Sequence, residues 1–227
     1  TAALVGSDAV YRAFFKQKGV IRVEHSDELI DLAKIFANSR RPKGNRVGIL
    51  STSGGAGIMA ADTFSQYGLE IPDLEPETSK KIEGIIPSFG SAANPVDVTA
   101  QIFNQPEYLK NCLQAMVEDK NIDSLLVSLS TVGGELAEII AKGIAEVYQH
   151  TKKPIAVSWG ASNKLAGNAY ALLSKAGVPV YKQPVRCAKA LSILTNYAKD
   201  QEKYCQEAEL TESKDNGIRE KLLEKLE

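Results

Sequence analysis

Short apolar runs alternate with amphipathic helical segments over most of this sequence. The clearest run, Ser124–Ser130, is almost continuously apolar, which is typical of a strand buried on both faces of a sheet. Residues 134–148 follow it, with apolar side chains every three or four positions along one helical face. Strands that alternate with helices predict a parallel sheet covered on both sides. We therefore predict an α/β fold, a flavodoxin-like doubly wound parallel sheet, over residues 43–199.

The other predicted elements continue this alternation. Strand-like or extended segments are expected at residues 46–52, 69–71, 154–159 and 178–181. Helices are expected at residues 54–67, 77–86, 106–118, 162–175 and 184–196, and residues 87–99 are expected to form a loop.

The first 42 residues do not fit this domain. They predict a helix over 7–15, a strand over 20–23 and a second helix capped by Ser26. A helix, one strand and a helix cannot close a sheet of their own. We interpret residues 1–42 as the end of a preceding domain plus a linker, with the basic, aperiodic run 39–45 at the boundary.

The C-terminal residues 200–227 also differ from the domain. Residues 199–216 are polar and charged, which favours a surface linker. Ile218, Leu222 and Leu226 then repeat every four residues and predict a terminal helix. That helix either packs on the domain or leads to a further one.

Charge and cysteine content narrow the function. The 227 residues carry 27 basic and 28 acidic side chains, a net charge of −1, so no overall field favours nucleic acid or an anionic membrane. Any anion site must be local. Cys112, Cys187 and Cys205 lie far apart without metal-ligand spacing, so we expect no metal site and a reduced, cytoplasmic setting.

Two glycine-containing turns are the candidate binding site. Each follows a predicted strand, where ligands bind in open parallel sheets. Backbone N–H groups and the helix dipole at such turns attract phosphate, worth about 0.3–1 kcal/mol per helix terminus. The alternative is that these glycines only permit tight turns or close packing. The candidate residues are Ser53, Gly54, Gly55, Ala56 and Gly57 in the first turn and Gly133, Gly134 and Glu135 in the second.

The first turn also fits a dinucleotide-binding fingerprint, since residues 55–60 read Gly-Ala-Gly-Ile-Met-Ala. An acidic residue should follow to hold the ribose, and Glu70 or Asp73 could do so. Ordinary solvated charge is the simpler interpretation of both. A P-loop is excluded because no Gly-Lys-Ser/Thr closes the glycine run.

A third motif, Asn94-Pro95-Val96-Asp97-Val98-Thr99, could support the glycine turns. Asn94, Pro95, Asp97 and Thr99 combine a stiff turn with side chains that hydrogen-bond to backbone, although they would equally suit a turn with a helix cap. The two histidines, His25 and His150, lie outside the glycine turns and are interpreted as structural.

Taken in order, these segments resemble the NDP-forming acyl-CoA synthetases, the superfamily of succinyl-CoA synthetase and ADP-forming acetate–CoA ligase. The resemblance covers Thr1 to about Lys199 and rests on residues 1–11, Gly19–Val23, Gly44–Ile49, the two glycine turns and the Asn94–Thr99 motif. It implies the end of a phosphohistidine-bearing ligase-type domain at residues 1–42, followed by a flavodoxin-like domain.

The resemblance implies an acid–thiol ligase, in which acid, CoA and ATP give acyl-CoA, ADP and phosphate through a phosphohistidine. A helix N-terminus from each of two domains cradles that group, and the helix at Gly133–Gly134 would be one of them. The complete enzyme would use CoA, ATP or ADP, phosphate and Mg²⁺, with this fragment binding no cofactor alone. Its partners would be CoA-binding and ATP-grasp domains, the small acid and CoA, with self-association also open.

One departure from the family pattern concerns the nucleophile. The family's histidine precedes a Thr-Gly-Ala-Leu stretch, which here reads Thr1-Ala2-Ala3-Leu4. The resemblance therefore places the histidine immediately before Thr1, and we expect residues 1–227 to be inactive alone. Two other interpretations stay open, namely a regulatory region of a protein acetyltransferase and a dinucleotide-binding Rossmann domain.

Overall fold

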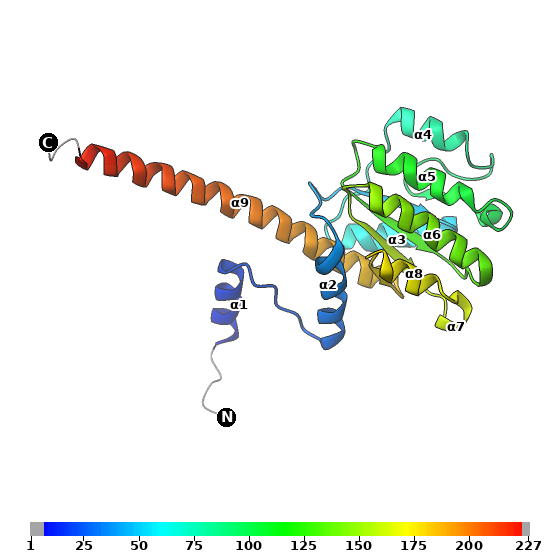
Figure 1. The fold of residues 1–227 in the computed structure, drawn as a ribbon, viewed down its shortest axis with the longest axis horizontal. Helices are drawn as coiled ribbons and strands as arrows, with labels where there is room; N and C mark the ends of the chain where they lie inside the picture. Colours follow the sequence, from blue (N-terminus) through cyan, green and yellow to red (C-terminus); the bar gives the residue numbers. More distant parts are fainter. Residues whose placement is uncertain (1–6, 224–227) are drawn as a thin grey trace, which may run out of the picture. The chain divides into compact units, whose positions relative to one another are not determined.

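The computed structural model describes residues 7–223, with side chains up to residue 204 (Figure 1). The described chain forms two compact units. One comprises residues 23–195 and contains the sheet, and the other comprises the described residues before Val23 and after Thr195. Among the described residues, no helix is both long enough and apolar enough to cross a membrane.

The larger unit is built on a five-stranded parallel sheet with the strand order β2-β1-β3-β4-β5. This is the order of the flavodoxin-like doubly wound fold, so the predicted fold class is confirmed. The three central strands are buried at every position, as their apolar runs indicated. The strands are β1 (Val47–Ser51), β2 (Val96–Asp97), β3 (Ser124–Leu129), β4 (Ile155–Trp159) and β5 (Val180–Tyr181).

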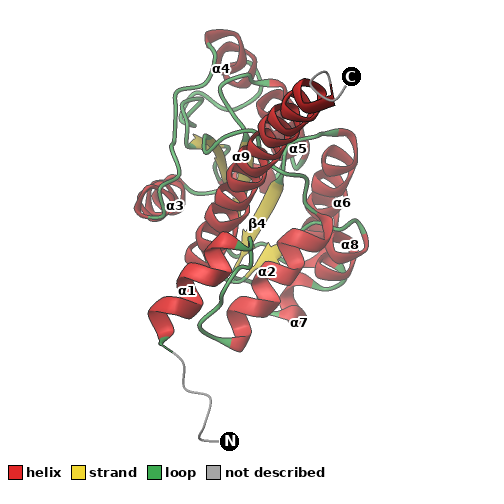
Figure 2. Cartoon of the chain, turned by 90° about the vertical axis from the view of Figure 1, so that its left-hand side faces the viewer, coloured by secondary structure: helices red, strands yellow, loops and turns green. Residues whose placement is uncertain are grey.

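Helices cover both faces of this sheet. Successive contacts join α4 to α5, α5 to α6 and α6 to α8, and Figure 1 shows these helices side by side. Helix α3 lies on the opposite side of the sheet from α6 (Figure 2). The helices of this unit are α2 (Ser26–Asn38), α3 (Gly54–Gln66), α4 (Pro76–Glu83), α5 (Glu107–Glu118), α6 (Gly134–His150), α7 (Asn163–Ala166), α8 (Ala169–Lys175) and the start of α9 (Pro184–Leu223), with a 3₁₀ turn η2 (Ala100–Phe103).

Helix α2 packs within this larger unit, although its sequence was assigned to the preceding segment. Leu32 and Ile35 are buried, and the Tyr181 hydroxyl donates a hydrogen bond to the carbonyl oxygen of Asp31 over 3.0 Å. The Tyr148 hydroxyl likewise donates to the Asn38 carbonyl oxygen over 2.9 Å. The structure therefore groups α2 with the sheet.

The smaller unit contains α1 (Asp8–Gln17) and the part of α9 beyond Thr195. Gly19 ends the first turn after α1 with a φ of +65°, a conformation that favours glycine. The Tyr204 hydroxyl donates to the Lys16 carbonyl oxygen over 3.3 Å. Val10 and Phe14 of α1 are exposed.

In three places the predicted secondary structure was wrong. Residues 20–23 form no strand, because the structure places no neighbouring strand beside them to supply hydrogen bonds. Residues 199–216 are helical rather than irregular, since α9 continues through them to Leu223; Glu, Lys and Gln are good helix formers, so polarity did not exclude a helix. Their role as a linker stays a prediction. The expected loop 87–99 contains β2, whose two residues are too few to show a periodic pattern.

The predicted helix over 162–175 is divided in two. Gly167 has a φ of +55° and separates α7 from α8. The other predicted helices and strands are present with ends that differ by a few residues, except that the helix predicted over 184–196 is the start of α9, which continues to Leu223. Residues 69–71 contribute only a single bridge between Glu70 and Arg46.

Candidate functional site

The two glycine turns lie side by side at one edge of the sheet. β1 and β3 are adjacent parallel strands, with Ser51 paired to Ser128, so their carboxyl ends meet. Beyond them the Thr52 amide donates to the Ser128 carbonyl oxygen over 3.2 Å, and the Ser130 amide donates to Thr52 Oγ1 over 3.1 Å. Because α3 and α6 leave on opposite sides of the sheet, this is the crevice where doubly wound folds bind ligands (Figure 2).

In the first turn, two of the glycines are closely packed. A methyl group added to Gly57 would lie 3.2 Å from Pro95 Cβ and 3.3 Å from Ser51 Cβ. One added to Gly54 would lie 3.0 Å from Asp97 Oδ2. The Asp97 carboxylate thus lies beside the first residue of α3 and already places a negative charge at that helix N-terminus. The close-packing alternative therefore accounts for Gly54 and Gly57.

The rest of the first turn is held by serine. Ser51 Oγ donates to the Ser53 carbonyl oxygen over 2.8 Å and accepts from the Ser53 amide over 3.2 Å. Gly55 is exposed and an added methyl group there would meet no other atom within 4 Å. Ala56 follows in the first turn of α3. This turn is rigid, with only its outer residues open.

The second turn is more open at its helix. Gly134, the first residue of α6, has a φ of +63°, is exposed, and has no atom within 4 Å of an added methyl group. Gly133 before it is covered by Leu165, and Trp159 Nε1 donates to the Val132 carbonyl oxygen over 3.2 Å. Gly133 has no side chain to cap the 17-residue helix α6, so its position supplies no side-chain acceptor for the first N–H groups of the helix.

Glu135 belongs to the first turn of α6 and is exposed. The structure brings the five residues of the first turn and the three residues of the second turn to the same crevice. Neither α3 nor α6 has a side-chain cap at its N-terminus; that of α3 lies beside the Asp97 carboxylate, whereas that of α6 begins at the exposed Gly134.

The Asn94–Thr99 motif lies against the first turn. The Asn94 amide acts as an extra partner for β1: Oδ1 accepts from the Ile49 amide over 2.8 Å, and Nδ2 donates to the Val47 carbonyl oxygen over 2.9 Å. Nδ2 also donates to the Pro72 carbonyl oxygen over 2.8 Å. β2 begins only at Val96, opposite Leu50. The Asn94 side chain therefore supplies the hydrogen bonds to the earlier residues of β1 that a neighbouring strand would otherwise make.

The end of this motif is also ordered by side chains. Asp97 Oδ1 accepts from the Thr99 amide over 2.8 Å, and Thr99 Oγ1 accepts from the Gln101 amide over 3.1 Å. Thr99 has a φ of +61°, rare for a β-branched residue and a sign of strain held by these bonds. The bracing and capping interpretations of the motif therefore describe one arrangement.

The dinucleotide-binding alternative does not fit the geometry. Glu70 pairs with Arg46 before β1 begins, and the Asn121 side chain, before β3, donates to the Asp73 carbonyl oxygen over 3.2 Å. Both acidic residues thus lie at the amino ends of the strands, whereas the glycine turns lie at the carboxyl ends. A ribose-binding acid is needed at the carboxyl end.

Neither histidine joins the glycine turns. His25 precedes α2 as its N-cap residue, and His150 is the last residue of α6, with Nδ1 2.8 Å from the Glu146 carbonyl oxygen. In the part of the chain that the structure describes, no three His, Cys, Asp or Glu side chains are grouped to hold a metal ion.

Burial makes two of the cysteines poor nucleophiles. It raises the pKa of the Cys112 thiol to about 12 and raises that of Cys187 as well, with the Asp31 carboxylate adding to the effect on Cys187. Since the thiolate is the reactive form, neither is suited to covalent chemistry near neutral pH.

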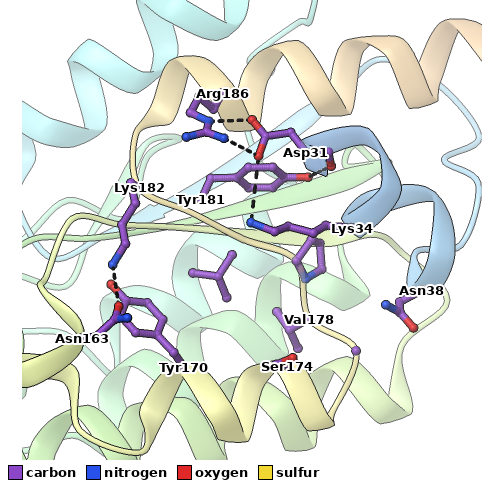
Figure 3. Close-up of a pocket in the computed structure, with 13 residues that line it drawn as sticks. Asp31, Lys34, Asn38, Asn163, Tyr170, Ser174, Val178, Tyr181, Lys182 and Arg186 are labelled. Atoms are coloured by element: carbon purple, nitrogen blue, oxygen red, sulfur yellow. Dashed lines mark hydrogen bonds and ion pairs between the residues drawn. The ribbon is translucent and has the colours of Figure 1, made fainter. Parts of the chain in front are cut away.

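A separate pocket of about 290 Å³ lies along the edge strand β5, between α2 and α8 (Figure 3). Tyr170 and Tyr181 contribute rings to it, and Lys182 Nζ lies 4.0 Å from the centre of the Tyr170 ring. The Lys182 ammonium is held by the Ala161 carbonyl oxygen at 2.7 Å. No sequence pattern indicates this pocket, because its side chains come from four separate segments with no shared motif.

The fold and this crevice define a doubly wound α/β domain with a candidate anion site at its strand-order switch. Two family models match the chain: the Ligase-CoA domain over residues 47–201, and the succinyl-CoA ligase like flavodoxin domain over residues 1–36. The chain therefore belongs to the Ligase-CoA domain family. From the sequence we expected the ligase-type domain at residues 1–42 and the flavodoxin-like domain at residues 43–199, so the two family names fall in the opposite order. The division at residues 42 and 199 stays a prediction.

Named relatives agree with this family. The chain is 32% identical over 206 residues to the acetate–CoA ligase [ADP-forming] II subunit alpha of Pyrococcus furiosus, covering 88% of this chain and 44% of that relative. It is 30% identical over 226 residues to acetate–CoA ligase [ADP-forming] I of Archaeoglobus fulgidus, covering 100% of this chain and 31% of that relative. The chain thus spans less than half the length of these relatives.

A solved structure gives the same result. The dinucleotide forming acetyl-coenzyme A synthetase 1 of Ca. Korarchaeum cryptofilum, in complex with phosphate and ADP, superposes with a TM-score of 0.74 at 27% identity, covering 87% of this chain and 42% of that one. The resemblance to acyl-CoA synthetases is confirmed.

Proposed function

We propose that this chain is part of an ADP-forming acid–thiol ligase, and that its crevice at β1 and β3 cradles a phosphorylated histidine. The observation that carries the proposal is the uncapped N-terminus of α6 at Gly134, which opens beside Thr52 and Ser130 at the strand-order switch. The family and the names of its relatives support the same reaction class.

In the proposed reaction, phosphate attacks an acyl-CoA and releases CoA, which leaves an acyl phosphate. The phosphoryl group then passes to histidine and from it to ADP, and the reverse sequence makes acyl-CoA from acid, CoA and ATP. The first N–H groups of α6 would stabilise the phosphoryl charge, since the helix dipole places about half a positive charge there. Asp97 at α3 would keep a second anion from binding on the other side of the crevice.

The histidine must come from a position other than His25 and His150. His150 is at the C-terminal end of α6, the opposite end from Gly134, and His25 belongs to the N-cap of α2. We propose that it precedes Thr1, that residues 1–42, 43–199 and 200–227 are the three segments of the chain, and that CoA-binding and ATP-grasp domains complete a cytoplasmic enzyme.

Activity of the full-length protein tests this proposal. We expect release of ADP that depends on acid, CoA and ATP together. Ser130→Asp should reduce that release about tenfold or more, because it adds a negative charge where the phosphoryl group would bind. Ser65→Asp, at an exposed position near the other end of α3, is the matched control and should retain activity.

The outcomes separate the alternatives. Absence of ADP release from the full-length wild type would refute the ligase and favour a regulatory role. If Ser130→Asp leaves the activity unchanged, the crevice does not bind the phosphoryl group, although the ligase reaction itself would not be refuted. Phosphate seen in crystals only at sites distant from Gly134 would have the same meaning.

A further inference from the structure

A second pocket lies at the opposite edge of the sheet from the glycine turns. It has a volume of about 760 Å³ and is formed by the loops before β1, β3 and β4, within the unit of residues 23–195. Since these strands are parallel, the loops meet at their amino ends. The lining residues are Arg40, Arg41, Lys43, Arg46, Val117, Glu118, Asp119, Lys120, Ile122, Asp123, Lys152 and Lys153.

Positive charge dominates this lining, which has seven cationic and three acidic side chains in a chain whose net charge is −1. The inner cations have fixed partners. Arg46 binds the buried Asp123 carboxylate through two hydrogen bonds of 2.9 Å, and Lys153 Nζ donates to the Asp119 carbonyl oxygen. These contacts build a rigid floor for the pocket.

The outer cations are not neutralised in the same way. Lys43 and Lys152 are exposed, and neither has a hydrogen bond or ion pair within the part of the chain that the structure describes. Lys120 Nζ lies 4.0 Å from Glu75 Oε1 and is 87% exposed, so that pair is weak. Three ammonium groups from three different loops therefore surround the pocket with little compensation.

Stabilisation of helix ends explains only some of these cations. The pocket lies where α5 and α6 end, and cations are favourable at helix C-termini. Arg40 donates to the carbonyl oxygen of Thr151, the C-cap residue of α6, and Lys153 to that of Asp119, the C-cap residue of α5. Within the part of the chain that the structure describes, no carbonyl oxygen accepts from Lys43 or Lys152, so stabilisation of helix ends does not account for them.

Burial of Lys153 adds a second indication. Burial lowers the pKa of its ammonium group, although the Asp119 and Asp123 carboxylates oppose that effect. A bound anion would stabilise the protonated form further. The pocket floor thus holds a cation that an anion would stabilise.

The lining also indicates the class of anion. Its twelve residues include no aromatic side chain on which a base could stack, while the apolar contribution is limited to Val117 and Ile122. Lysines presented from separate loops suit a chain of phosphates, which carries several charges a few ångströms apart.

We propose that this pocket binds the di- or triphosphate group of a free anion, whether inorganic or carried by a nucleotide. It is separate from the crevice at Gly134 and would bind its ligand whether or not the proposed ligase activity holds. A sequence signal for it was present in the basic run at residues 39–45 and in Lys152–Lys153, which only the fold brings together.

Calorimetric titration of the 227-residue chain with inorganic triphosphate at low salt tests this proposal. The double variant Lys43→Ala/Lys152→Ala should bind at least about tenfold more weakly than wild type. The control is Lys80→Ala/Lys142→Ala, which removes the same charge from exposed positions on α4 and α6. It should bind within about twofold of wild type.

Further arms identify the source and the site. ATP should bind about as well as triphosphate, and adenosine should not bind. Ser130→Asp, in the glycine crevice, should leave triphosphate binding unchanged. If both double variants weakened triphosphate binding equally, the loss would reflect net charge alone. If the pocket variant did not weaken binding, the ligand would bind elsewhere. Either result overturns the proposal.

Discussion

Arg186 of α9 binds Asp31 of α2 through two hydrogen bonds, Nε to Oδ2 at 2.5 Å and Nη2 to Oδ1 at 2.8 Å (Figure 3). The two residues are 155 positions apart. The Asp31 side chain is only 9% exposed, whereas that of Arg186 is 36% exposed. The pair therefore fixes α2 to the unit that contains the sheet, with a buried carboxylate that depends on its partner.

Arg186→Met should destabilise the chain because it leaves the Asp31 carboxylate buried with only Lys34, at 4.0 Å, as a cationic neighbour. A fully buried pair would lose about 3–5 kcal/mol, so we expect about 2 kcal/mol for this partly exposed one. Urea unfolding measures it. Lys81→Met, which breaks an exposed pair with Glu118, should cost less than about 0.5 kcal/mol. Equal losses would contradict the structural role of Arg186.

Asn94→Ala should also destabilise the fold. It removes three hydrogen bonds to backbone groups of Val47, Ile49 and Pro72, two of them on a buried strand. At roughly 1 kcal/mol each we expect a loss of about 2–4 kcal/mol in the free energy of unfolding. Asn94→Asp keeps the acceptor for Ile49 but turns a carboxylate oxygen toward the Val47 and Pro72 carbonyl oxygens, so it should destabilise the fold as well. Asn104→Ala, at an exposed position, is the control, and a comparable loss there would contradict the bracing role.

The central sheet was predictable because β1, β3 and β4 are buried on both faces and therefore read as continuous apolar runs. The candidate crevice followed from them, since adjacent parallel strands bring their carboxyl ends together. β2 was not predictable from Val96 and Asp97 alone, because its position depends on pairing with β1.

The remaining site features depend on contacts across the fold. Asp97 reaches Gly54 only once β2 pairs with β1, so the carboxylate beside α3 has no local signal. The basic pocket combines loops more than 100 residues apart, from Lys43 to Lys152. Polar residues 199–216 indicated exposure, and exposure suits a surface helix as well as a linker.

Gly217 lies within α9 and allows a direct test of whether this segment is a continuous helix or an irregular linker. Glycine within a helix is less favourable than alanine by about 0.8–1 kcal/mol, so Gly217→Ala should increase the helical signal in far-UV circular dichroism. Gly217→Pro should decrease it, because proline removes a hydrogen bond and clashes with the preceding turn. A linker would leave both spectra unchanged, which would contradict the continuous helix.

Asp123 predicts how stability depends on pH. Burial alone would raise the pKa of its carboxyl group, but hydrogen bonds from the Arg46 guanidinium and amide outweigh burial and lower it. A pKa below the unfolded value of about 3.9 means that this group stabilises the fold fully above that pH and loses its contribution as the pH falls through the folded pKa. Urea midpoints should therefore fall in acid.

Asp123→Asn isolates this contribution, because it retains the shape of the side chain without the charge. We expect lower stability than wild type near pH 7. The difference should shrink as the pH falls below about 4, because the unfolded wild-type chain then takes up a proton at Asp123 before the folded chain does. Asp62→Asn, at an exposed position on α3, should follow the wild-type curve throughout. If the Asp123→Asn difference stayed constant down to about pH 3, the Arg46 pair would not be the source of the acid sensitivity.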